Sequence, residues 1–170
     1  SCCWCCKIQW SYEKWPRSLW CFEKNTKLLT AESCTGGLLT ANITGVAGSS
    51  NVFSYGFICY SNNSKKKLLN VSDKVINSYG AVSYQTVKEM LVGLCDQAES
   101  KTLTIAISGV AGPKRSENKP VGLVFIGTKL SYYDSEEIAE LNFGDIGRNK
   151  IQQKSVNEAL KMSLSLIKDS

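Results

Sequence analysis

The sequence predicts an α/β fold in which helices cover a mostly parallel sheet. Stretches rich in β-forming residues alternate along the chain with stretches whose apolar residues recur at helical spacing. In addition, glycine-rich segments directly follow two of the predicted strands, as the ligand-binding loops of parallel sheets do. The chain has 170 residues, a length that suits one domain with its own core.

The first half of this domain begins with a predicted strand over residues 27–31. A glycine-rich loop follows and leads into a helix over residues 38–44. A second strand is predicted over residues 52–61, where aromatic residues alternate with smaller ones. Ser83 is placed to cap a helix that continues to about residue 99.

The second half contains three further predicted strands, over residues 102–108, 120–129 and 136–143, and a closing helix over residues 148–167. The two long helices each have one apolar face. For the earlier helix this face comprises Val87, Met90, Leu91, Leu94, Cys95 and Ala98; for the closing helix it comprises Ile151, Val156, Ala159, Leu160, Ser163 and Ile167.

Residues 1–25 differ in composition from residues 26–170, which form the predicted domain. This segment holds all four tryptophans and five of the eight cysteines. Pro16 suits the first turn of a helix that runs to about residue 25, and we expect that helix to pack on the domain or on a partner subunit. A membrane-surface role or a non-native leader stays open. Cys3 and Cys6 have zinc-ligand spacing but lack a second ligand pair, so no metal site is predicted.

The composition excludes several classes of function. The chain has no histidine, so Ser-His-Asp sites, Cys-His sites and His-ligated metals are excluded. The net charge of +5 suits an anionic small substrate such as a phosphate ester. The single basic triplet, residues 65–67, has no arginine beside it, so nucleic-acid binding is not expected. No apolar run reaches the length of about 18 residues that a membrane helix needs.

Two loops carry residues that could act together chemically. In the loop after the first strand, Ser33 and Cys34 are candidate nucleophiles beside free backbone N–H groups, although a simple tight turn would also explain the glycines. At the end of the second strand, Tyr60 and Lys65 can converge on one point. In the absence of histidine, a lysine amine is the natural base for a serine hydroxyl. The alternative is that Lys65 is a solvated surface lysine.

Together these segments resemble the CinA C-terminal domain family, whose best-known members are nicotinamide-nucleotide amidases of the PncC type. The resemblance covers about residues 26–168. The matching segments are Thr30-Ala31-Glu32-Ser33-Cys34-Thr35-Gly36-Gly37, Ala47-Gly48-Ser49-Ser50, Tyr60-Ser61-Asn62 with Lys65, Gly80-Ala81-Val82-Ser83, Ser108-Gly109-Val110-Ala111-Gly112-Pro113 and Lys119-Pro120-Val121-Gly122.

The resemblance implies a three-layer α/β/α sandwich with a mixed, mostly parallel sheet, in a protein that forms a homodimer or a higher homo-oligomer. The scattered Cys34, Cys59 and Cys95 suggest thiols in a reducing compartment, so we expect a cytoplasmic protein. It implies hydrolysis of the carboxamide of nicotinamide mononucleotide to nicotinic acid mononucleotide and ammonia, without a metal or cofactor. Ser33 is then the nucleophile, Lys65 its base, and Tyr60 a hydroxyl that relays protons or tunes the lysine. The candidate oxyanion and substrate-binding residues are Cys34, Thr35, Gly36, Gly37, Ser49, Ser50, Ser108, Gly109 and Arg148.

Three features depart from the family pattern. Residues 1–25 are unlike the helix that usually opens this domain, the segment 144–148 has one extra residue, and Gln152 replaces a residue that is often basic. Two other functions stay open. One is a binding module that keeps the site but does regulatory or competence-related work, and the other is a thiol amidase in which Cys34 attacks with help from Glu32 and Lys65.

Overall fold

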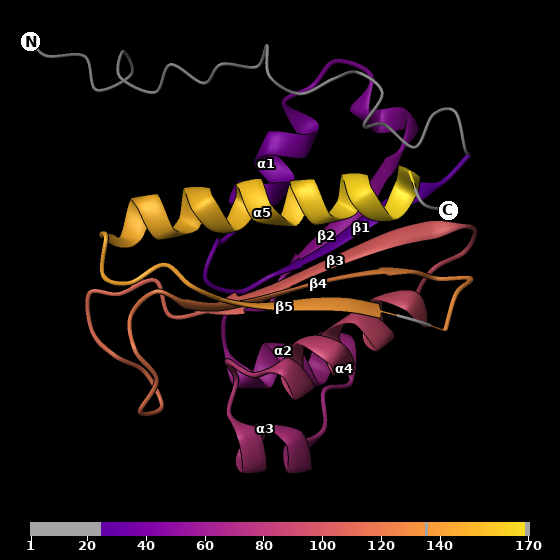
Figure 1. Ribbon diagram of the computed structural model, residues 1–170. Helices are drawn as coiled ribbons and strands as arrows, with labels where there is room; N and C mark the ends of the chain where they lie inside the picture. The colour runs from indigo at the N-terminus through magenta and orange to yellow at the C-terminus, as the bar shows by residue number, and fades with distance from the viewer. Residues whose placement is uncertain (1–24, 135, 169–170) are drawn as a thin grey trace, which may run out of the picture.

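The computed structural model describes residues 25–134 and 136–168, and it has three layers (Figure 1). A central sheet lies between two helical layers, with α1 and α5 on one face and α2, α3 and α4 on the other. The helices are α1 (Leu38–Thr44), α2 (Asn62–Leu69), α3 (Asp73–Tyr79), α4 (Tyr84–Cys95) and α5 (Arg148–Lys168), with a 3-10 turn, η4 (Ser49–Asn51), between α1 and the second strand. The three-layer α/β/α prediction is therefore confirmed.

The sheet is mixed, as predicted. Its strands are β1 (Lys27–Glu32), β2 (Phe53–Ile58), β3 (Thr102–Gly109), β4 (Leu123–Leu130) and β5 (Glu136–Asn142), in the spatial order β2-β1-β3-β4-β5. β1 pairs in parallel with β2 and β3, whereas β3–β4 and β4–β5 are antiparallel. Because β1, β2 and β3 run in the same direction, the loops that follow them all lie at the carboxyl ends of these strands, on the same side of the molecule.

The sheet separates two apolar cores. One lies between the sheet and α1 with α5, and the other between the sheet and the layer of α4. The alternation along β3 supplies both, because Ile105 and Ile107 belong to the first core and Ala106 to the second. All six predicted apolar-face positions of α5 are buried, and so are Val87, Met90, Leu91 and Leu94 of α4; Cys95 and Ala98 are half-buried.

The chain differs from the sequence predictions at a few element ends. The second strand ends at Ile58 because Ser61 caps a helix, α2, that the apolar pattern did not reveal. Helix α4 starts after Ser83 as predicted but ends at Cys95. The predicted N-terminal helix and the cysteine- and tryptophan-rich segment lie outside the described residues, apart from Asn25, whose φ of 50° is not helical.

Among the helices of residues 25–134 and 136–168, none has the length and apolar character that a membrane span requires.

Candidate active site

The Ser33 loop joins β1 to α1 and is held by a buried carboxylate. Glu32, the last residue of β1, is fully buried. Its carboxylate accepts hydrogen bonds from the backbone N–H groups of Gly37 at 3.1 Å, Leu39 at 2.9 Å and Thr40 at 2.8 Å. These N–H groups belong to the start of α1, which would otherwise leave them unpaired. One side chain thus caps the helix and fixes both ends of the loop.

The loop itself is a tight turn that needs glycine. The N–H of Gly36 donates to the carbonyl of Ser33 at 3.1 Å, and the N–H of Ser33 donates to the carbonyl of Ile107 at 3.0 Å. Gly36 and Gly37 have φ values of 59° and 101°, in the left-handed region that favours glycine. The loop is therefore fixed both to itself and to the neighbouring strand β3.

These contacts change which N–H groups are available to a ligand. The resemblance implied that Cys34, Thr35, Gly36 and Gly37 are candidate oxyanion-binding residues. The N–H groups of Gly36 and Gly37 already donate within the chain. Within the described part of the chain, the N–H groups of Cys34 and Thr35 donate to no other residue, and that of Cys34 faces its own thiol. The free donors of the loop are therefore Cys34 and Thr35.

Lys65 reaches the Ser33 hydroxyl from the other helical layer. Its side chain is 1% exposed, and its Nζ lies 3.0 Å from Ser33 Oγ. Nζ also donates to two backbone carbonyls, that of Cys59 at 2.7 Å and that of Tyr60 at 3.4 Å. The alternative interpretation, a solvated surface lysine, is therefore wrong for Lys65.

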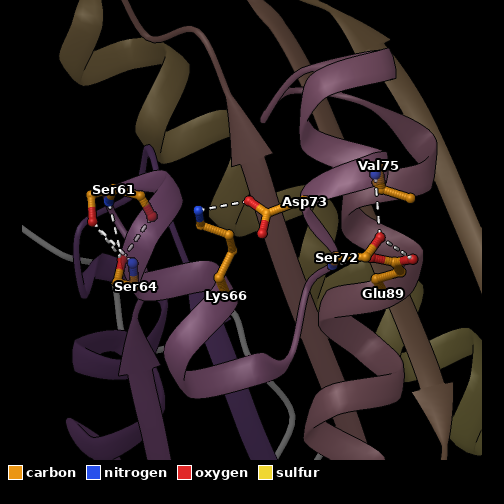
Figure 2. Close-up of polar contacts among 7 residues, drawn as sticks. All are labelled: Ser61, Ser64, Lys66, Ser72, Asp73, Val75 and Glu89. Carbon is orange, nitrogen blue, oxygen red and sulfur yellow. Dashed lines mark hydrogen bonds and ion pairs between the residues drawn. The ribbon is translucent and has the colours of Figure 1, made fainter.

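Helix α2, which carries Lys65, is anchored at several points (Figure 2). Ser61 and Ser64 form a reciprocal capping box at its start. Lys66, the next residue after Lys65, turns outward and pairs with Asp73 of α3 at 2.8 Å. Ser72, which caps α3, is bonded in turn to Glu89 of α4. These contacts link α2 to α3 and α3 to α4, so the backbone that carries Lys65 is braced by its neighbours.

Burial shifts the two titratable side chains beside Ser33 in opposite directions. Burial penalises the charged ammonium and lowers the pKa of Lys65 from its usual 10.5, while the nearby Cys59, Cys34 and Glu117 act in the opposite sense. Burial raises the pKa of the Cys34 thiol to about 12. Burial thus favours the neutral amine of Lys65 and the protonated thiol of Cys34.

The Tyr60 hydroxyl points to an arginine. Arg148 donates from one nitrogen to Tyr60 Oη at 2.9 Å and from the other to the carbonyl of Gly112 at 2.7 Å. Tyr60 is 60% exposed and contacts Lys65 only through its carbonyl. The Tyr60 hydroxyl was predicted to be a partner of Lys65. In this structure it instead accepts a hydrogen bond from Arg148 and helps to orient that side chain.

Gln152 also contacts the Ser33 loop, although sequence reasoning noted it only as a departure from the family pattern. Its Nε2 donates to the carbonyl of Cys34 at 2.8 Å across 118 residues of sequence. Arg148 and Gln152 lie four residues apart in α5, so both project from one side of this helix toward the site. The signal that could have revealed Gln152 is this spacing from Arg148.

The remaining predicted residues divide into two groups. Ser108 and Gly109 end β3 beside the site: the Ser108 hydroxyl donates to the carbonyl of Ala81 at 2.7 Å, and a side chain at Gly109 would meet the Cys34 sulfur. Ser49 and Ser50 are not brought to it within this chain. They precede β2 and lie where the parallel strands begin, next to Lys27, whereas Ser33 follows the end of β1.

The arrangement provides a buried amine, a serine hydroxyl in contact with it, two free N–H groups and an exposed arginine. Such a set can activate the serine, stabilise an oxyanion and attract an anion. Among the described residues, no group of three or more His, Cys, Asp or Glu side chains is placed to hold a metal ion.

Comparison with known proteins identifies the family. A family model for the CinA C-terminal domain matches residues 18–167. A CinA-like protein of Prochlorococcus marinus is 42% identical over 146 residues, which are 85% of this chain and 34% of that protein. The chain thus spans about a third of the length of the curated relatives it matches.

Solved structures agree with this assignment. The competence/damage inducible protein CihA of Agrobacterium tumefaciens superimposes with a TM-score of 0.81 at 38% identity, over 86% of this chain and 88% of that one. A CinA superfamily protein of Klebsiella pneumoniae gives a TM-score of 0.82 at 27% identity, over 88% and 92% of the two chains. From the matched residues, the sequence identity and the shared architecture, the chain belongs to the CinA C-terminal domain family.

Proposed function

We propose that this domain is a serine amidase that hydrolyses the carboxamide of nicotinamide mononucleotide. The observation that carries the proposal is the contact between Lys65 Nζ and Ser33 Oγ, 3.0 Å apart, with both side chains buried. A lysine that merely filled the core would be costly there, because burial disfavours its charged form. A lysine that acts as a base gains from the same burial.

The two carbonyls around Lys65 orient its amine. A neutral amine has two N–H donors and one lone pair. If the donors are directed to the carbonyls of Cys59 and Tyr60, the lone pair faces the Ser33 hydroxyl. The amine then accepts the serine proton as Ser33 Oγ attacks the carboxamide carbon.

The remaining steps follow from this transfer. The carbonyl oxygen gains negative charge, and the free N–H groups of Cys34 and Thr35 are the donors available to stabilise it. The protonated Lys65 gives its proton to the amide nitrogen, the C–N bond breaks, and ammonia leaves an ester on Ser33. Water, deprotonated by Lys65, attacks that ester. The protonated Lys65 then returns the proton to Ser33 Oγ as the C–O bond breaks, which frees Ser33 and the neutral amine and releases the acid product, whose carboxyl group ionises in water.

Arg148 is the candidate contact for the substrate phosphate. Two donors of its guanidinium are held by Gly112 and Tyr60, and a guanidinium has five, so further donors remain. Its charge is felt at Cys34, where it lowers the thiol pKa against the larger effect of burial. The described cysteines Cys34, Cys59 and Cys95 are free thiols, which fits the proposed cytoplasmic location.

The test is ammonia release from nicotinamide mononucleotide by the wild type and by four variants. We expect Ser33→Ala and Lys65→Ala to lower kcat at least about a thousandfold, because each removes a group that takes part in bond formation. Cys34→Ala should keep at least a tenth of the activity, since its thiol is protonated and only its backbone N–H is used. Lys67→Ala, an exposed lysine of the same helix, is the matched control.

Two outcomes would contradict the proposal. If Cys34→Ala is inactive while Ser33→Ala turns over, the thiol is the nucleophile. If the folded wild type binds the mononucleotide but releases no ammonia, the domain is a nucleotide-binding module instead.

A further inference from the structure

The turn that carries Ser33 contains one peptide whose direction matters for acyl transfer. The hydrogen bond from Gly36 N–H to Ser33 C=O closes a four-residue turn, and the Cys34–Thr35 peptide is its central unit. This peptide carries both the carbonyl of Cys34 and the N–H of Thr35. In turns of this kind the central peptide can take two opposite directions, which distinguish type I from type II.

Gln152 holds this peptide in one direction. Its Nε2 donates to the Cys34 carbonyl at 2.8 Å. A trans peptide is planar and its C=O and N–H point to opposite sides, so the Thr35 N–H points away from Gln152 and helix α5. Figure 1 shows α2, which carries Lys65, on the face of the sheet opposite α5. The local sequence favours the same direction, because the reversed peptide would require a positive φ at Thr35, which this β-branched residue does not have.

Thr35 has unused donors at this point. Its N–H lacks an acceptor within the residues that the structure describes. Its hydroxyl oxygen is also buried without a hydrogen-bond partner, in a residue that is 3% exposed. Buried polar groups are nearly always paired, so two unpaired groups on one residue indicate a place for a ligand atom. Thr35 lies two residues after Ser33 in the chain, separated from it only by Cys34.

We propose that Gln152 is a positioning residue for acyl transfer: by binding the Cys34 carbonyl, it directs the Thr35 N–H toward the oxyanion that forms when Ser33 attacks. The inference rests on the proposed serine chemistry but not on the identity of the substrate. Gln152 donates to the Cys34 carbonyl, on the side of the peptide opposite the Thr35 N–H. It forms no hydrogen bond with Ser33 or Lys65, the proposed reacting groups. It should therefore affect kcat much more than KM.

The experiment follows two reactions in the full chain. One is ammonia release from nicotinamide mononucleotide, and the other is acylation of Ser33 by p-nitrophenyl acetate, read as a burst of p-nitrophenol. Gln152→Ala removes the donor and should lower both rates about fivefold, the effect of one neutral hydrogen bond. Gln152→Glu keeps the shape but sets a carboxylate against the carbonyl, and should lower them about tenfold or more.

Gln152→Lys returns a donor and should restore both rates to within about twofold of the wild type, a rescue that a merely structural role would not give. Gln153→Ala is the matched control, because Gln153 is the same residue type on the same helix and is exposed. Melting temperatures of all variants establish that each is folded.

The outcomes separate this inference from the proposed function. If Ser33 is acylated with the expected order of rates but nicotinamide mononucleotide releases no ammonia, the proposed substrate is wrong and the role of Gln152 stands. If folded Gln152→Ala and Gln152→Glu react as fast as Gln153→Ala, or if Gln152→Lys fails to recover, the positioning role is wrong. A wild type that p-nitrophenyl acetate does not acylate at Ser33 overturns both.

Discussion

The role proposed for Lys65 depends on where α2 places its side chain. A lysine in water is almost entirely protonated at neutral pH and cannot accept a proton from serine. In this domain the side chain is 1% exposed and burial lowers its pKa from the usual 10.5. The two neighbouring lysines of the same helix, Lys66 and Lys67, are not buried in this way, so burial does not favour their neutral amines.

The pH dependence of activity should report this lowered pKa. The reaction needs the neutral amine, so kcat/KM should rise with pH up to the pKa of Lys65 and then level off below pH 10.5. The measurement is a pH profile of ammonia release, with Lys67→Ala expected to follow the wild type. A profile that shows no rise between about pH 6 and pH 10 would contradict a lysine base.

At the scale of single residues, the sequence predicts the contact between Ser33 and Lys65, the proposed reacting groups, better than the contacts of the residues around them. Ser33 and Lys65 lie in motifs with a chemical meaning, and the absence of histidine leaves few other bases. The partner of the Tyr60 hydroxyl was not predictable, because Arg148 lies 88 residues away in sequence. Gln152 was missed as a contact because its signal, the four-residue spacing from Arg148, has meaning only once Arg148 is known to lie at the site. Contacts between distant segments depend on how α5 crosses the sheet, which no local pattern encodes.

At the scale of elements, α2 and α4 pack so closely that a glycine is required between them. A Cβ atom at Gly93, in the last turn of α4, would lie 2.1 Å from the carbonyl oxygen of Leu69 and 2.7 Å from its carbonyl carbon. These are backbone atoms at the end of α2, so they cannot move without the helix. Leu69 lies one turn after Lys65, which ties this contact to the site.

Gly93→Ala should therefore destabilise the domain, although alanine is the better helix former by about 1 kcal/mol. The clash with backbone should outweigh that gain and cost about 1–3 kcal/mol net, seen as a lower melting temperature, and the displaced α2 should lower kcat. Val92→Ala, an exposed position of the same helix, is the control. A Gly93→Ala domain that melts at or above the wild-type temperature would contradict this account.

The helices were predictable from the sequence where the apolar pattern repeats over several turns. Helix α5 and most of α4 show this, because each buries a continuous face against the sheet. Helices α2 and α3 were not predicted as such. Each buries few side chains, those of Lys65 and Leu69 in α2 and of Ile76 in α3, and short polar helices of this kind are defined by their serine caps and neighbours instead of by a period.

At the scale of the whole molecule, the buried amine of Lys65 links stability to pH. Its pKa is lower in the folded state than the ordinary value of 10.5 expected in the unfolded chain, so the unfolded chain binds more protons between these two values. Across that window the free energy of unfolding contributed by Lys65 rises with pH. Below the lowered pKa the contribution stays at its minimum.

Lys65→Met should remove this dependence while filling the same space. The free energy of unfolding of the wild type, minus that of Lys65→Met, should therefore increase as pH rises through the window. Denaturant unfolding at a series of pH values measures it, and subtracting the two proteins cancels the groups they share. Lys67→Met should run parallel to the wild type. If Lys65→Met also runs parallel, the lysine is not desolvated in the fold.

The carboxylate of Glu32 should make adjacent positions of the Ser33 loop respond differently to mutation. One buried side chain ends β1, caps α1 through three N–H groups and spans the loop that holds Ser33. In a library of random variants, substitutions at Glu32 should therefore group with those of the apolar core, which reduce the amount of folded protein. Substitutions at Ser33 should instead leave abundance unchanged and abolish turnover. Selection would thus conserve the adjacent codons 32 and 33 for different reasons, the first for folding and the second for activity.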